Sequence, residues 1–148
     1  MIKTFSPKAK DLTRKWYLLD ASEQPLGRLA TAAARLLIGK DKPTQSPHFD
    51  GGDYVVVINA ASLKTQPNKM QRKTYYRHSG FPGGLHKRSL AEQVNLNPSK
   101  VIEHAIRGML PDNKLRDPRL KRLKVYVDEN HHHEAQVPIK LDPVKGKK

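Results

Sequence analysis

The chain has 148 residues, no cysteine and a formal net charge of +14, from 28 Lys and Arg against 14 Asp and Glu. This length accommodates one domain with a hydrophobic core. The lack of cysteine excludes disulfides, thiolate nucleophiles and the usual structural zinc sites, and the positive charge favours a polyanionic partner such as nucleic acid.

The first predicted elements are a strand and a helix. Residues 15–21 form a short apolar run that ends in a polar turn, which is typical of a strand. Apolar residues then recur at helical spacing between Pro25, which suits a first helical turn, and Gly39, which suits a C-terminal cap. This helix places Arg28 and Arg35 on one side.

The rest of the chain continues the alternation of strands and helices. Residues 53–60 contain an uninterrupted β-branched run, which predicts a strand buried on both faces of a parallel sheet. A helix is expected from Pro98 with Asn97 as its N-cap, and a late strand over 123–127. We therefore expect one α/β domain with a largely parallel sheet and an ordered core of about residues 14–138. The basic ends, 1–13 and 139–148, are expected to be extended.

One long interval lacks acidic residues. No Asp or Glu occurs between Asp53 and Glu92. The cations inside this interval are Lys64, Lys69, Arg72, Lys73, Arg77, Lys87 and Arg88. Because the chain supplies no local counter-ions for them, we expect a surface that binds nucleic acid.

The segment "RKTYYRHSGFPGG", residues 72–84, lies at the centre of this interval. Its cations can bind phosphates, its tyrosines can stack on bases, and its glycines leave room for RNA to approach. The alternative is an edge strand with solvated lysines. In either case one of Tyr75 and Tyr76 is expected in the core, because neighbours on a strand face opposite ways. We expect RNA to order residues 78–85.

A second basic cluster, residues 113–124, includes Lys114 and Arg116. A solvated helix face and an RNA contact are equally good interpretations of this cluster.

Enzymatic and metal-binding interpretations find little support. The phosphate-binding loop motif fails because Ala34 and Asp41 stand where glycine and Ser or Thr are required, and the glycines of residues 80–84 do not open a helix after the first strand. Adjacent histidines at 131–133 lack the further ligands of a metal site. We expect no catalytic residues, cofactor, metal or small-molecule substrate.

A DNA-compacting or regulatory protein is the alternative, but no helix-turn-helix pairing or basic region with heptads occurs. No apolar run approaches the roughly 18 residues of a membrane span, and the N-terminus lacks the apolar core of a signal peptide. We expect a cytoplasmic protein without membrane association.

Several segments together resemble the bacterial-type large-subunit ribosomal protein L13 family. They are "WYLLDA", "PLGRLA", "GGDYVVVINA", "KTYYRHSGFPGG", "VIEHAIRGMLP" and "LKVY", in the family's order, and they extend over nearly the whole chain. The resemblance implies a three-layer α/β/α single domain with a small, mainly parallel sheet and basic extensions. It also implies a structural component of a cytoplasmic ribosome, with an organellar ribosome as the open alternative. This component has no catalytic role and binds large-subunit rRNA early in assembly beside neighbouring large-subunit proteins.

Family contacts with rRNA are expected at matching positions, namely Lys40, Lys42, Lys73, Tyr75, Arg77, His78, Ser79, Gly83 and Gly84. The charge pattern adds Arg28, Lys69, Arg72, Lys87, Arg88, Lys114 and Arg116 to this expected interface.

Overall fold

The computed structural model describes residues 6–141. The strands are β1 (Trp16–Asp20), β2 (Tyr54–Ile58), β3 (Thr74–His78), β4 (Leu85–Ser89), β5 (Leu123–Val125) and β6 (Ile139–Lys140). The α-helices are α1 (Leu26–Ile38), α2 (Pro67–Arg72), α3 (Leu90–Leu96), α4 (Pro98–Met109) and α5 (Arg116–Lys121). Short 3-10 turns, η1 (Ala9–Asp11), η2 (Ala60–Ser62) and η3 (Glu134–Gln136), complete the set.

The central sheet has four parallel strands in the order β5-β2-β1-β6. The strand β2 is buried from Val55 to Ile58, as its β-branched run predicts. The edge strand β6 pairs with Tyr17 and Leu18 of β1, and so lies beyond the expected end of the core at residue 138. Two residues are too short for a periodic pattern, which explains why the sequence did not predict this strand.

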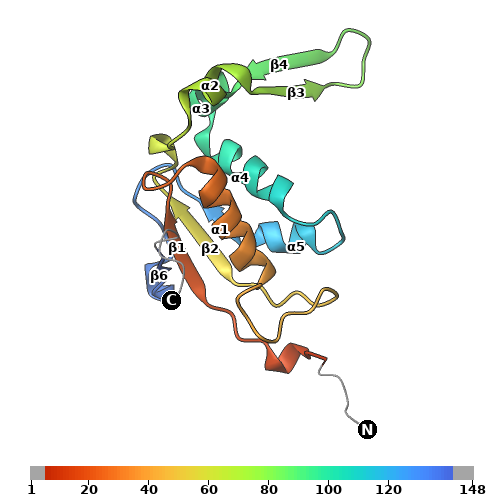
Figure 1. The fold of residues 1–148 in the computed structure, drawn as a ribbon, viewed down its shortest axis with the longest axis vertical. Helices are drawn as coiled ribbons and strands as arrows, with labels where there is room; N and C mark the ends of the chain where they lie inside the picture. The colour runs from red at the N-terminus through yellow and green to blue at the C-terminus, as the bar shows by residue number, and fades with distance from the viewer. Residues whose placement is uncertain (1–5, 142–148) are drawn as a thin grey trace.

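Helices α1 and α4 pack together beside the sheet (Figure 1) and enclose the main core. Leu19 and Val57 from the strands meet Leu37 from α1 and Ile106 from α4 there, all fully buried. The helix ends match their predicted caps. Gly39 adopts the left-handed conformation (φ 80°) after α1, and the Asn97 side chain accepts a hydrogen bond from the Lys100 amide before α4.

The opposite face of the sheet carries aromatic residues. Because side chains alternate along a strand, Trp16 faces away from the core that contains Leu19. The rings of Trp16 and Tyr54 stack with centroids 4.3 Å apart, and the His133 ring lies 4.8 Å from Trp16. His133, which follows β5, therefore covers part of this face.

The strands β3 and β4 form a separate antiparallel hairpin, which we call the arm (residues 74–89). It projects away from the sheet beyond α2 and α3 (Figure 1). A backbone hydrogen bond from the Leu90 amide to the Lys73 carbonyl, 2.8 Å long, closes its base. The arm is thus joined to the body at one end only.

The α/β fold with a mainly parallel sheet flanked by helices is confirmed. Residues 78–85 form a hydrogen-bonded hairpin turn in this structure, and the expectation that RNA orders them stays a prediction. Within residues 6–141, no helix is long and apolar enough to cross a membrane. Most of the expected basic ends, at 1–5 and 142–148, lies outside the described residues.

Candidate nucleic-acid interface

The arm separates its side chains onto two faces. Cross-strand partners in an antiparallel pair point to the same side, and successive residues point to opposite sides. The inner face therefore holds the pairs Tyr75 with Arg88 and Arg77 with His86. The outer face holds the pairs Tyr76 with Lys87 and His78 with Leu85.

Tyr75 anchors the arm to the body. Its half-buried ring packs against the core cluster and meets His104 of α4 edge-on, with centroids 5.3 Å apart. Burial raises the pKa of its phenol, which stays neutral at physiological pH. Tyr76, by contrast, is 64% exposed. Tyr75 is thus the tyrosine of the pair that packs against the core, although its ring is only half-buried.

The turn of the arm requires its glycines. Gly80 and Gly83 have φ of +89° and +73°, a region that side chains disfavour. A Cβ on Gly84 would lie 2.0 Å from Ser79 Oγ and 2.9 Å from the Phe81 carbonyl oxygen, so a side chain here would require the serine to rotate and the turn to shift slightly. Hydrogen bonds from the Ser79 amide to the Gly84 carbonyl (3.0 Å) and from the Gly84 amide to the Phe81 carbonyl (2.9 Å) close the turn. The glycines therefore shape the turn itself.

His78 is oriented by this turn. The Gly80 amide donates to His78 Nδ1 over 2.9 Å. Because Nδ1 accepts this hydrogen bond, the neutral ring holds its proton on Nε2. The exposed Nε2–H is then a donor suited to a phosphate oxygen.

A basic pocket lies at the foot of the arm, with a volume of about 560 Å³. We call it the basal pocket. Arg28 from α1, Lys69 from α2 and Lys73 at the start of the arm line it, above an apolar floor that includes Leu26 and Leu90. The fold thus gathers three expected contact residues that lie up to 45 positions apart in sequence.

The cations of the arm and the basal pocket have no acidic partners among the residues that the structure describes. Within residues 6–141, no ion pair involves Arg28 or any cation between positions 64 and 88. The first acid after the interval, Glu92, closes a capping box with Ser89 at the start of α3. These charges are left for an external anion.

Lys42 has an internal role instead. Its ammonium group donates to Asp53 Oδ1 (2.6 Å) and to the carbonyls of Thr13 and Gly51 (2.8 Å each). Lys40 is exposed, but it follows the end of α1 that is distant from the basal pocket. The structure therefore does not place these two lysines with the arm.

The second basic cluster, residues 113–124, is neither simply a solvated helix face nor simply an RNA contact. Arg119 and Arg122 are buried around Asp50, with Arg122 donating through both terminal nitrogens to the carboxylate. Burial alone would raise the pKa of Asp50, but the hydrogen bonds and charge of Arg122, with the charges of Arg119 and Arg14, lower it below its usual value. This part of the cluster stabilises the fold.

The remaining cations of this cluster lie elsewhere on the surface. Lys114 is exposed, and Arg116 is half-buried with an ion pair of 2.8 Å to Asp112. Both are on the α5 side of the molecule, away from the arm (Figure 1).

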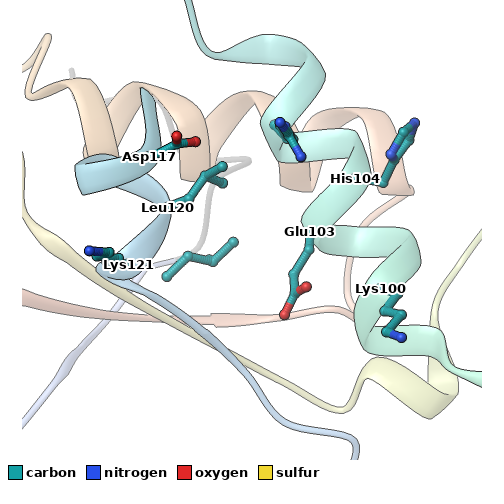
Figure 2. A pocket seen from close by; sticks show the side chains of 8 residues that line it. Lys100, Glu103, His104, Asp117, Leu120 and Lys121 are labelled. Carbon is teal, nitrogen blue, oxygen red and sulfur yellow. The ribbon is translucent and has the colours of Figure 1, made fainter. Parts of the chain in front are cut away.

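A second groove, of about 570 Å³, lies between α4 and α5. Figure 2 shows Lys100, Glu103 and His104 on α4 and Asp117, Leu120 and Lys121 on α5. Because acids and bases alternate around it, this groove offers a polyanion a weaker site than the arm does.

The histidines at 131–133 contact the aromatic face of the sheet. His133 Nε2 is 3.1 Å from the hydroxyl of Tyr126, and the His132 ring meets Tyr126 edge-on. Burial and the charge of Lys124 lower the pKa of His133. In the part of the chain that the structure describes, no three His, Asp or Glu side chains gather in a way that could hold a metal.

Three exposed residues of the arm are not among the contact positions expected from the sequence, namely Tyr76, Phe81 and His86. Their exposure depends on strand phase and turn shape. The adjacent Tyr-Tyr pair indicated that one ring would be exposed but not which.

The chain matches known proteins over most of its length. A family model described as ribosomal protein L13 matches residues 14–132. The large ribosomal subunit protein uL13 of Mycolicibacterium smegmatis is 53% identical over 139 residues, 94% of this chain and 95% of that protein. The proteins of the same name from Mycobacterium tuberculosis and Nocardia farcinica are 52% and 48% identical, covering 92% and 94% of this chain and 92% and 95% of theirs.

Proposed function

The chain belongs to the ribosomal protein L13 family, and we propose that it is a structural, non-enzymatic component of the large subunit of cytoplasmic ribosomes. In this proposal it binds large-subunit rRNA through the arm and the basal pocket, beside neighbouring ribosomal proteins. The binding supports early assembly of the subunit. No cofactor takes part.

The observation that supports rRNA binding is the set of unpaired cations on the arm. Arg77 and Arg88 on the inner face and Lys87 on the outer face are exposed and lack ion-pair partners among residues 6–141. Phosphate contacts by such side chains position a protein on RNA and dominate its affinity. The basal pocket extends this surface toward α1 through Arg28.

The arm offers RNA more than charge. Exposed aromatic rings interleave with its cations, which is the combination found where proteins bind unpaired nucleotides. A projecting hairpin also reaches into a folded RNA where a compact body cannot. Lys42, Lys114 and Arg116 are left out of the proposed interface because their positions or partners separate them from the arm.

The first test compares two triple variants that each remove three positive charges. One removes the charges of the arm, Arg77→Ala, Lys87→Ala and Arg88→Ala. The matched control removes those around the α4–α5 groove, Lys100→Ala, Arg107→Ala and Lys121→Ala. Binding of the full chain to folded large-subunit rRNA is measured at one salt concentration, with thermal melting to verify folding.

We expect the arm variant to lose at least about tenfold more affinity than the control, because each phosphate contact contributes to binding. Equal losses would contradict an interface centred on the arm. Retention of full affinity by the arm variant, with both proteins folded, would overturn the proposed rRNA surface.

Incorporation into the ribosome is tested separately. A tagged copy of the chain, expressed in a bacterium that has its own protein of the L13 family, should co-sediment with large ribosomal subunits and with their early precursors. Exclusive recovery in low-mass fractions would contradict the assembly role, whatever the affinity for isolated rRNA.

A further inference from the structure

The outer face and the tip of the arm expose large apolar and aromatic side chains to solvent. Phe81 at the turn is 73% exposed, Tyr76 is 64% exposed, and Leu85 is 50% exposed. Exposed aromatic residues that gather on one projecting element indicate a binding surface. A charged surface needs no such residues to contact phosphates, so the rings require a further explanation.

The surroundings of these rings indicate the chemistry of the partner. Lys87 Nζ lies 5.9 Å from the centroid of the Tyr76 ring, within cation–π distance. His78 Nε2 is free to donate beside Leu85 on the same face. A π-face next to a cation suits a nucleobase, whose ring stacks while its phosphate meets the charge.

The shape of the tip favours unpaired bases over a duplex. Paired bases are already stacked and present only their edges, whereas loops and bulges present open ring faces. The tight turn presents Phe81 to solvent, because Gly80 and Gly83 take positive φ and the Gly84 amide donates a hydrogen bond to the Phe81 carbonyl. The ring is therefore presented by a shaped turn.

We infer that Tyr76 and Phe81 stack on unpaired nucleobases, so that the outer face and tip of the arm bind a non-duplex segment of RNA. The inference rests on the proposed rRNA binding and adds the class of RNA structure that the tip recognises. The inner face and the basal pocket contact phosphates and do not distinguish single from double strands.

The test uses the full chain and two RNA probes. One is an unstructured 12-nucleotide RNA with 2-aminopurine at its centre, and the other is the same strand annealed to its complement. Affinity is measured for the variants Phe81→Ala, Phe81→Leu and Tyr76→Ala. Leu96→Ala is the matched control, because Leu96 is also 64% exposed but lies on α3.

We expect Phe81→Ala and Tyr76→Ala each to weaken single-strand binding by roughly five- to a hundredfold, with little effect on the duplex. Quenching of 2-aminopurine by the bound protein should fall in the same variants. Phe81→Leu should behave like Phe81→Ala, because leucine keeps the apolar contact but not the aromatic stack. Leu96→Ala should match the parent chain.

The inference would be overturned if the parent chain bound both probes and rRNA in a salt-sensitive way and the three arm variants bound them equally well. The proposed function would then remain intact. The exposed rings would then serve a protein contact. Retention of affinity by Phe81→Leu alone would overturn stacking in favour of a simple apolar contact. Absence of binding to rRNA would overturn the proposed function and the inference together.

Discussion

At the scale of single residues, the positive charges of this chain divide into internal and external groups. Arg122 and Lys42 donate to carboxylates and carbonyls inside the protein, and Arg119 forms an ion pair with Asp50. Arg77 and Lys87, by contrast, have no acidic partner within residues 6–141. The amino-acid composition alone does not distinguish the two groups. Only the three-dimensional position of Asp50 and Asp53 separates the two groups.

Gly52 is required by a close approach of two backbones. A Cβ at this position would lie 1.8 Å from the carbonyl oxygen of Leu37, an overlap that side-chain rearrangement cannot relieve. We expect Gly52→Ala to lower the free energy of unfolding by about 3 kcal/mol or more. Gly27→Ala is the control, because its Cβ meets nothing within 4 Å and alanine favours the helix. Urea denaturation measures both, and equal stability of the two variants would contradict this packing.

The half-buried carboxylate of Asp50, held by the buried Arg119 and Arg122, predicts a pH dependence of stability. Because the folded pKa of Asp50 lies below its unfolded value of about 3.9, the stabilisation is complete above that value and is lost as pH falls through the folded pKa. Asp50→Asn should cost roughly 3–5 kcal/mol at pH 7, since Arg122 stays buried without its counter-charge. The Asp50→Asn variant should also lose less stability than the parent chain when the pH falls below about 4.

The control for this prediction is Asp112→Asn, which breaks an exposed ion pair with Arg116. Such pairs contribute about 0–1 kcal/mol. Urea midpoints at pH 3 and pH 7 provide the comparison. An Asp50→Asn protein as stable at pH 7 as Asp112→Asn would disprove the structural role of the buried cluster.

At the scale of elements, the sequence predicted those whose pattern is local and long. The β-branched run of β2 and the helical spacing of α1 and α4 appear in the structure with their expected caps. The helices α2 and α5 have only six residues each, too few for a clear apolar period. The strands of the arm were harder to predict, because both are mostly exposed and charged. Neither strand has a buried face, so apolar and polar residues do not alternate clearly along it.

The attachment of the arm gives a prediction at this scale. Tyr75 packs against the core and the ring of His104, whereas its neighbour Tyr76 faces solvent. We expect Tyr75→Ala to destabilise the protein by about 2 kcal/mol and to increase amide exchange across residues 74–89. Tyr76→Ala should change neither quantity. The reverse ranking in denaturant and hydrogen-exchange experiments would show that the two faces of the arm are assigned wrongly.

At the scale of the whole molecule, the net charge is unevenly distributed. Acidic residues neutralise cations around the sheet, but none occurs between Asp53 and Glu92, the stretch that contains the arm. The candidate interface could be predicted from this gap, because a long interval without acidic residues can be recognised in the sequence without knowledge of the fold. The basal pocket could not be predicted so, because it joins residues from α1, α2 and the arm.

The most direct test of rRNA binding by the arm is the salt dependence of the affinity of the full chain for folded large-subunit rRNA. With roughly six phosphates neutralised, log K should fall with log salt at a slope of about −4 to −5. The variant lacking the charges of Arg77, Lys87 and Arg88 should have a slope shallower by about 2 to 3. A parent slope near zero, or a slope that this variant leaves unchanged, would contradict the account.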